Sequence, residues 1–332
     1  MTHSPLVTVL LPVYNSEKFL AESIRSILCQ SFEDFELIIL NDGSVDRSEE
    51  VAKSFTDKRI RYFSHANMGL ANTLNKGISL AVGKYIARQD NDDISHPERL
   101  QRQISFLEKN RDYVLVGSAA AIINEDGTPS GRKHKHPTRS PYLKLDLIFD
   151  NPFVHSSVVF HKEVVQNSGG YISSPDFFED HNLWSRVSYK HKVANLSDEL
   201  LLYREVQSGM SKSANAYSKK VSHQCELNLD YYIAHQSENR KISEMFQCMA
   251  PSRDDKILYK EIVKQLIEKT FEGETIEEKN IAMRRFELKL KMAQVRHQLA
   301  KPDISGIQKL VLKIKRRVIF NRYNHLILSH HF

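Results

Sequence analysis

The chain has 332 residues, of which 41% are hydrophobic and 27% charged, with 47 Lys and Arg against 41 Asp and Glu. This composition is typical of a globular protein and excludes the disordered and fibrous classes. The length fits two domains, or one large α/β domain with an appendage. Three scattered cysteines are too few for a disulfide framework or a Cys-x-x-Cys metal site, which favours a reducing, cytoplasmic setting.

The first 125 residues alternate between strand and helix patterns. Residues 7–11 and 35–40 are continuous apolar runs of strand length, as expected for strands buried on both faces of a parallel sheet. Apolar residues at helical spacing follow each run, and further strands are expected at 61–64, 84–89 and 113–124. This alternation predicts a doubly wound, mostly parallel sheet flanked by helices.

Two sequence features predict where later elements begin and end. Ser95 and Glu98 form a capping-box pattern for the helix that follows. Residues 213–332 are charged and helical in pattern and lack strand signals. We therefore expect a catalytic α/β domain at 1–212 and a helical C-terminal region at 213–332.

The C-terminal tail, about residues 305–332, has an amphipathic and basic pattern. Residues 301–332 contain seven basic side chains and one acidic one, which accounts for the whole net charge of +6. This pattern predicts a helix that binds an anionic membrane surface. The alternative is that the helix packs on the preceding domain or on a dimer partner. The localised charge argues against nucleic acid as a partner. The apolar positions are Ile307, Leu310, Val311, Ile314, Val318 and Ile319.

Acidic clusters follow two of the predicted strands. Asp42 ends one strand, and residues 90–93 place three carboxylates within four positions at the end of another. In open α/β sheets ligands bind beyond the carboxyl ends of the strands, and hard oxygen ligands suit Mg²⁺ or Mn²⁺ bound together with a diphosphate. The alternative is a solvated acidic turn at the start of a helix. The glycines include no GxG pair, which disfavours dehydrogenases, and no GxxxxGK[ST], which disfavours P-loop enzymes.

Five motifs in register carry a resemblance to a known family. They are Val9–Asn15 (VLLPVYN), Asn41–Asp46 (NDGSVD), Asn67-x-Gly69 with Asn72 and Asn75, Gly83–Asp93 (GKYIARQDNDD), and Glu179-Asp180 before Leu183-Trp184. Over roughly residues 5–212 the chain resembles the family 2 glycosyltransferases. The resemblance implies a GT-A fold that transfers a sugar from a nucleotide donor with inversion at the anomeric carbon.

The resemblance also implies roles for matched residues. Asp180 would be the catalytic base, supported by Glu179, and Asp92 would hold the metal, Mn²⁺ or Mg²⁺, with Asn91 in place of the family's usual small residue. His155 and Lys212 are candidate donor-side contacts, and Trp184 is either an acceptor-stacking platform or a core residue. The expected nucleotide-binding residues are Pro12, Tyr14, Asn15, Asp42, Asn72, Arg88, Asp90 and Asp93.

From this resemblance we expect a UDP-linked hexose or N-acetylhexosamine as donor and a lipid-linked or oligosaccharide acceptor for a bacterial lipooligosaccharide, O-antigen or capsule. No leader pattern or apolar run of membrane-spanning length is found in the sequence, so we expect a cytoplasmic protein, peripheral on the inner face of the cell membrane. The alternatives are a catalytically inactive sugar-nucleotide-binding protein and a sugar nucleotidyltransferase.

Overall fold

The computed structural model describes residues 4–206, 214–233, 243, 253–299 and 306–328. The chain divides into two compact units, one made of Met1–Thr138 and Asn151–Ser213 and the other of Arg139–Asp150 and Ala214–Phe332. The boundary predicted at 212 therefore places one segment, residues 139–150, on the wrong side, because this segment packs with the C-terminal helices.

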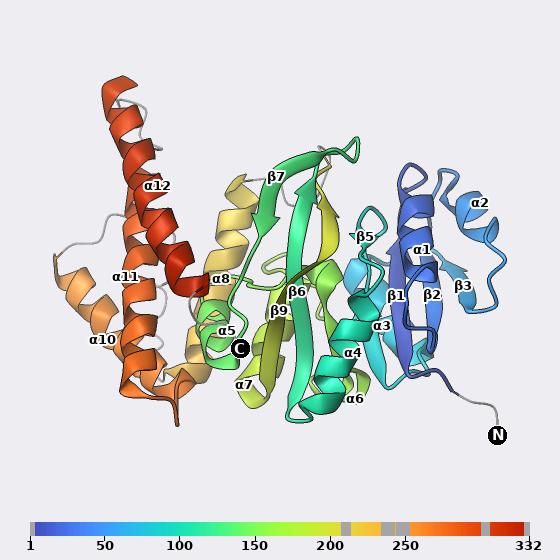
Figure 1. Ribbon diagram of the computed structural model, residues 1–332, viewed down its shortest axis with the longest axis horizontal. Coiled ribbons are helices and arrows are strands. Elements are labelled where there is room, and N and C mark those ends of the chain that lie inside the picture. The colour runs from blue at the N-terminus through green and yellow to red at the C-terminus, as the bar shows by residue number, and fades with distance from the viewer. Residues whose placement is uncertain (1–3, 207–213, 234–242, 244–252, 300–305, 329–332) are drawn as a thin grey trace. The chain divides into compact units, whose positions relative to one another are not determined.

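The first part of unit 1 is a parallel sheet in the order β3-β2-β1-β4, with β2 and β4 paired to either side of β1. Figure 1 shows β1, β2 and β3 beside one another. Its strands are β1 (Val7–Val13), β2 (Phe35–Asp42), β3 (Ile60–His65) and β4 (Tyr85–Arg88). The connecting helices are α1 (Leu20–Leu28), α2 (Ser48–Lys53) and α3 (Leu70–Leu80). The parallel sheet with helices between its strands matches the fold class predicted for this part of the chain.

Beyond β4 the sheet becomes mixed. Strand β8 pairs antiparallel with both β4 and β6, β9 runs parallel to β6, and β5 and β7 pair antiparallel with β9 and β6. These strands are β5 (Ile94–Ser95), β6 (Tyr113–Ile123), β7 (Pro129–His134), β8 (Val159–His161) and β9 (Lys192–Arg204). The helices are α4 (Arg99–Lys109), α6 (Lys162–Asn167) and α7 (Glu179–Lys190), with a 3-10 turn at His155–Ser157.

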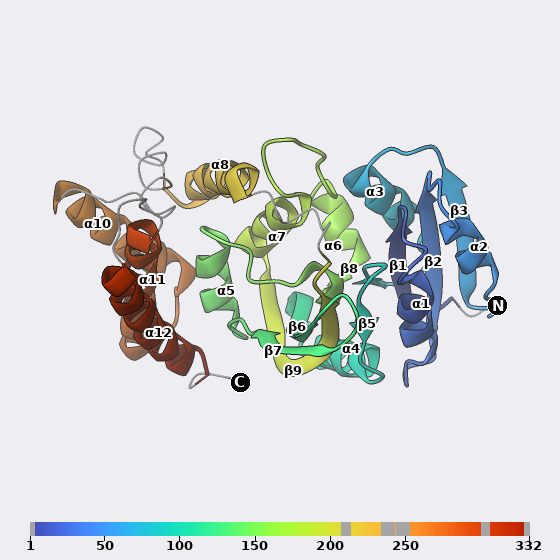
Figure 2. The same cartoon turned by 90° about the horizontal axis from the view of Figure 1, so that it is seen from above.

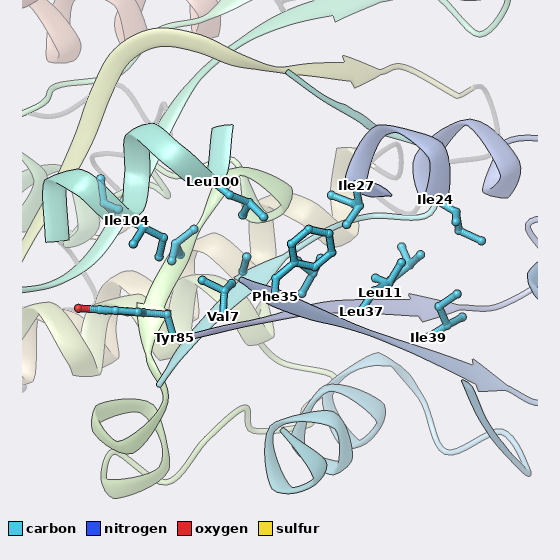
Figure 3. Packing of buried hydrophobic residues seen from close by; sticks show 14 of the residues in the cluster. Val7, Leu11, Ile24, Ile27, Phe35, Leu37, Ile39, Tyr85, Leu100 and Ile104 are labelled. Carbon is cyan, nitrogen blue, oxygen red and sulfur yellow. The ribbon is translucent and has the colours of Figure 1, made fainter. Parts of the chain in front are cut away.

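Both faces of the parallel sheet are covered, which explains why β1 and β2 are buried at every position and mostly apolar. Alternate residues of β1 and β2, such as Leu11 and Leu37, point toward α1 and α4 and form one buried cluster with them (Figure 3). On the opposite face α3 packs so closely that a Cβ atom on Gly77 would lie 2.2 Å from Cδ1 of Leu10. Figure 2 shows α1 and α3 on opposite sides of β1 and β2. This packing fixes the strand ends that carry the candidate site.

Unit 2 is helical where the structure describes it. The segment 139–150, which contains α5, shares a core with the helices at 214–232, 253–270 and 276–299. This core includes Phe149, Leu266 and Phe286. Beside this core, the Asp146 carboxylate accepts from Lys289 Nζ at 2.8 Å and from Arg285 Nη2 at 3.2 Å. The helices are α5 (Ser140–Leu147), α8 (Ala214–Tyr232), α10 (Arg253–Thr270), α11 (Ile276–Leu299) and α12 (Gly306–Leu328).

The capping box expected at Ser95 and Glu98 is absent. Ser95 lies in β5, which pairs with β9, and its hydroxyl donates to Gln89 Oε1 at 2.7 Å. Helix α4 begins at Arg99, and its preceding residue, Glu98, makes no side-chain capping bond. Because β5 pairs with β9, which is distant in sequence, Ser95 lies in a strand and does not cap α4.

We expect the sheet core to dominate the stability of unit 1. Val9 is fully buried, whereas Val45 is 89% exposed, so Val9→Ala and Val45→Ala make the same chemical change in opposite environments. Val9→Ala should lower the free energy of unfolding by about 2 to 3 kcal/mol, and Val45→Ala should leave it nearly unchanged. Urea denaturation followed by fluorescence measures both, because Trp184, the single tryptophan, is fully buried in unit 1. Equal effects would contradict this account of the core.

Candidate functional site

The loops after β1 and β2 are joined to each other at one edge of the sheet. The Asn15 backbone N–H donates to Ser44 Oγ at 3.0 Å, and the Asn15 side-chain oxygen accepts from the Val45 backbone N–H at 2.9 Å. Asn15 has a φ of 47°, a left-handed conformation that asparagine tolerates better than most residues. Tyr14, next to it, is 52% exposed and therefore accessible to a ligand at this edge.

Asp42, at the end of β2, organises the start of α3. Its two carboxylate oxygens accept backbone N–H bonds from Met68 at 2.7 Å and Gly69 at 3.0 Å. Asn72 reinforces this turn, because its side-chain amide donates to the Met68 carbonyl at 2.8 Å. The structure thus places Asp42 at the expected strand end and Asn72 in the first turn of α3, and both hold the backbone ahead of that helix.

The acidic loop, residues 90–93, follows β4 and faces the ends of β1 and β9. Asn91 donates to the Pro12 carbonyl at 3.2 Å, which ties the loop to β1. Asp90 accepts from Arg88 at 2.5 Å and from the Ser156 hydroxyl at 2.8 Å. Asp93 is buried, contacts Ser156 and accepts from the Arg204 backbone N–H at 2.8 Å. The loop is therefore anchored by neighbours on several strands.

The three aspartates differ in their pKa. Desolvation alone would raise the pKa of Asp90, but the Arg88 guanidinium and the Ser156 hydrogen bond hold it below its usual value. Desolvation and the charges of Asp90 and Asp92 raise the pKa of Asp93 well above its usual range. A protonated Asp93 can donate to the Ser156 oxygen while the single serine proton goes to Asp90.

Asp90 and Asp92 are both partly exposed, and Asp92, which no described cation pairs with, is the carboxylate of the acidic loop that is better suited to a metal ion. Desolvation, with the neighbouring charge of Asp90, raises the pKa of Asp92 to about 6. A divalent cation would offset both effects, because it supplies the positive charge that this carboxylate lacks. In the part of the chain that the structure describes, no group of three or more His, Cys, Asp or Glu side chains is placed to hold a metal ion by itself.

A buried polar network supports the acidic loop from behind. Arg99 is fully buried and donates to Gln89 Oε1 at 2.9 Å, to the Arg88 carbonyl at 2.7 Å and to Gln103 Oε1 at 3.1 Å. The Gln89 amide in turn donates to the Asp93 carbonyl at 2.9 Å. Positive charge and amide donors thus fix the backbone of a loop whose carboxylates repel one another.

Arg204, at the end of β9, contacts the acidic loop from its other side, and the sequence analysis gave it no role in the site. Its guanidinium donates to the backbone carbonyls of Asp92 at 2.9 Å and Glu125 at 3.1 Å, and it pairs with Glu22. The guanidinium also stacks over Phe19, 4.6 Å from the ring centroid. Only the three-dimensional structure brings these partners together, since none of them is close to Arg204 in sequence.

Asp180 lies at the start of α7, beside Glu179. Its Oδ1 accepts from the His181 backbone N–H at 2.6 Å, and its Oδ2 accepts from the Asn151 side-chain amide at 2.8 Å. Desolvation, with the charge of Glu179, raises the pKa of Asp180 to about 7. A carboxylate with this pKa can accept a proton near neutral pH, which suits a general base.

The structure also gives the surroundings of three further predicted residues, Arg88, Trp184 and His155. Arg88 is 1% exposed and bonds to Asp90, so it supports that carboxylate from inside the protein and does not face an open nucleotide surface. Trp184 is fully buried against Phe160 and Tyr171, which favours the core interpretation over an acceptor-stacking platform. His155 contacts the Tyr171 hydroxyl at 3.0 Å, and desolvation lowers its pKa to about 3, which leaves it neutral. Lys212 lies outside the described residues.

We expect Arg204 to be essential for the stability of the site. Arg204→Met removes a buried charge together with the hydrogen bonds that it donates to two backbone carbonyls, so the free energy of unfolding should fall by about 2 to 4 kcal/mol. Arg102→Met is the matched control, because Arg102 forms exposed ion pairs with Glu98 and Asp198 and its loss should change stability little. Urea denaturation monitored by Trp184 fluorescence compares the two, and equal stability of both variants would refute the assignment.

Comparison with known proteins agrees with this arrangement. Residues 8–168 match the family described as glycosyl transferase family 2. The O-antigen biosynthesis glycosyltransferase WbnJ of Escherichia coli is 31% identical over 250 residues, covering 74% of this chain and 94% of WbnJ. The amylovoran biosynthesis glycosyltransferase AmsE of Erwinia amylovora is 34% identical over 205 residues, covering 60% of this chain and 76% of AmsE.

Solved structures share the fold. S. aureus TarS 1-349 in complex with UDP-GlcNAc aligns with a TM-score of 0.58 at 15% identity, over 96% of this chain and 91% of that one. The mannosyltransferase PcManGT from Pyrobaculum calidifontis, in complex with GDP-Man and Mn²⁺, aligns with a TM-score of 0.52 at 13% identity, over 98% and 85%. The GT-A fold expected from the motifs is confirmed. The sheet, the acidic loop and these relatives together show that the chain belongs to glycosyl transferase family 2.

Proposed function

We propose that this glycosyltransferase moves a hexose or N-acetylhexosamine from a UDP donor to a hydroxyl group of a bacterial surface glycan, with inversion at the anomeric carbon. The observation that carries the proposal is the Asp180 carboxylate, whose pKa of about 7 suits proton abstraction near neutral pH. Two relatives support the chemistry of the substrates: WbnJ is named for O-antigen biosynthesis, and TarS was solved with UDP-GlcNAc.

In this proposal the residues of unit 1 divide the work between donor and acceptor. The exposed Tyr14 and the joined loops at Asn15 and Asp42 would bind the nucleotide at the edge of the sheet. Asp180 would take the proton of the acceptor hydroxyl as its oxygen attacks the anomeric carbon from the face opposite the diphosphate. The attack breaks the bond to the diphosphate, which leaves with the nucleotide, and the sugar configuration is inverted.

Mn²⁺ or Mg²⁺ fits the acidic loop through Asp92. That carboxylate is partly exposed and has a raised pKa, whereas Asp90 and Asp93 are engaged by Arg88, Ser156 and Arg204. When bound, the cation would offset the negative charge that develops on the departing diphosphate. PcManGT was solved with Mn²⁺, which supports a divalent cation in this fold.

Calorimetric binding of UDP, GDP and CDP, each with and without Mn²⁺, tests the donor assignment. Tight binding of UDP that depends on Mn²⁺ would support it, and preference for GDP or CDP would overturn the UDP assignment while leaving the transferase intact. Release of UDP from UDP-hexoses and UDP-N-acetylhexosamines then distinguishes an enzyme from a sugar-nucleotide-binding protein. Binding without any turnover would favour the inactive binding protein.

Asp180→Asn should abolish transfer and leave UDP affinity within about twofold, because an amide keeps the size of the side chain but cannot accept the proton. For the unmodified protein, turnover should rise with pH through about 7, because the base works only when ionised and desolvation raises its pKa. Below that pH the rate should fall about tenfold per unit. Steady-state rates from pH 5 to 9 measure this. Strong residual transfer by Asp180→Asn would refute the base assignment.

We also propose that α12 binds the anionic inner surface of the cell membrane, close to a lipid-linked acceptor. No described helix is both long and apolar enough to cross a bilayer. One face of α12 packs on α11, where Ile319 and Tyr323 meet Met292 and Val295. Ile319 thus belongs to the packed face and not to the exposed stripe in which the sequence placed it.

The opposite face of α12 is an exposed apolar stripe with basic residues along it. Its apolar members, each 47 to 59% exposed, are Leu310, Val311, Ile314 and Val318. The accompanying cations, all exposed, are Lys309, Lys313, Lys315, Arg316, Arg317 and Arg322. An apolar stripe accompanied by cations complements a lipid surface that has an anionic headgroup layer over an apolar interior.

The double variant Leu310→Asp with Ile314→Asp should weaken binding to vesicles of 70% phosphatidylcholine and 30% phosphatidylglycerol about tenfold or more, because it places two anions in the stripe. Ile257→Asp on α10 is the control, since Ile257 is 63% exposed but lies outside the stripe. Vesicle co-sedimentation at low salt measures the affinity. Equal binding by the double variant and the control would refute the membrane role.

A further inference from the structure

Asn151 contacts Asp180 through an amide whose orientation is fixed. The Asn151 side-chain oxygen accepts from the Phe153 backbone N–H at 3.1 Å, so its NH₂ group must point the other way. That group donates to Asp180 Oδ2 at 2.8 Å. The hydrogen-bond pattern therefore distinguishes the oxygen of this amide from its nitrogen. The group that donates to the candidate base, Asp180, is a neutral NH₂.

The backbone around Asn151 is held as firmly as its side chain. Pro152 restricts Asn151 to extended conformations, and Phe153 is buried. The Pro152 carbonyl accepts from the side-chain amide of Asn195 at 3.0 Å, and that same amide donates to the Pro137 carbonyl at 3.2 Å. Asn195 belongs to β9, so the donor on Asp180 is anchored to the sheet and not to a free loop.

The charges around Asp180 explain why a neutral donor matters. Glu179 on α7 and Asp90 in the acidic loop disfavour the ionised carboxylate, and Arg88 on β4 favours it. Tyr171 also faces Asp180, and desolvation raises the pKa of its hydroxyl, so it remains neutral. A hydrogen bond donated to the carboxylate stabilises the ionised form without the large lowering of pKa that a bonded cation would cause.

We propose that Asn151 is a positioning residue that fixes the Asp180 carboxylate in place and favours its ionised form for proton abstraction. The proposal rests on the proposed function, because it assumes that Asp180 is the base. Asn151 acts through Asp180 and needs no contact with the donor sugar or the acceptor.

Carboxyl-carbon NMR of protein labelled with ¹³C-aspartate tests the interaction without any substrate, with Asp180→Asn identifying the resonance. Asn151→Ala should raise the pKa of Asp180 by about one unit, which corresponds to a tenfold change in ionisation. Asn151→Asp should raise it further, because it keeps the acceptor for Phe153 but places a second carboxylate against Asp180. Asn110→Ala is the matched control, since the Asn110 amide donates to the Phe106 carbonyl on α4 and should leave the pKa unchanged.

Release of nucleotide diphosphate, measured from pH 6 to 9 with the donor selected by calorimetry, tests the consequence. Asn151→Ala should be about tenfold slower than the unmodified protein at pH 6, about fivefold slower at pH 7 and within about twofold at pH 9, where Asp180 is ionised in both. A deficit of equal size at every pH would identify a merely structural role and overturn the proposal, as would an unchanged Asp180 pKa in both variants.

The two proposals can fail separately. If Asp180→Asn still transfers sugar, the base assignment fails, and the positioning role of Asn151 fails with it. If Asp180→Asn is inactive while the Asn151 variants keep the original pH profile and Asp180 pKa, the base assignment stands and Asn151 has no positioning role.

Discussion

The mutual repulsion of the aspartates after β4 is the constraint on which the rest of the site depends. Three carboxylates within four residues are destabilising unless positive charge and hydrogen-bond donors surround them. Arg88, Arg99 and Arg204 provide both, and each is nearly or fully buried. Because Arg88, Ser156 and the Arg204 backbone N–H engage Asp90 and Asp93, Asp92 is the member of the loop best placed for a cation. The carboxylates thus divide into those that build the loop and one suited to a ligand.

The environment of Asp180 differs from that of the acidic loop and suits the proposed role of a general base. A guanidinium bonded to a carboxylate lowers its pKa, which makes the carboxylate a weaker base. Asp180 instead receives its side-chain hydrogen bond from the neutral amide of Asn151, and its pKa is about 7. Asp90, bonded to Arg88, has a lowered pKa. The two carboxylates thus differ: the ionised form of Asp90 is favoured, whereas Asp180 titrates near neutral pH, a pattern that other enzymes use to assign acid and base roles.

The parts of this structure that were predictable are those whose signals are local. The apolar runs that predicted β1 and β2 are continuous because helices cover both faces of these strands, and the strand ends located Asp42 and the acidic loop correctly. The pairs Arg204–Asp93 and Asn151–Asp180 were not predictable, since their members lie 111 and 29 residues apart. The position of Ser95 in a strand was not predictable either, because it depends on pairing with the distant β9. Residues 139–150 were expected in the 1–212 domain for the same reason, because the partners with which they pack in unit 2 come much later in the chain.

Helix α12 shows a further limit of periodicity. A helix with one apolar face shows one set of apolar residues at helical spacing. Helix α12 has two apolar faces, and the sequence analysis treated their residues as a single face. Successive residues of a helix are about 100° apart, so Ile319 lies about 140° around the axis from Ile314 and reaches the opposite side. Ile319 packs on α11, whereas Ile314 is 57% exposed. The packed face already anchors α12 within unit 2, and the contacts within that unit leave the second stripe exposed, so its composition fits the apolar surface of a partner or a membrane.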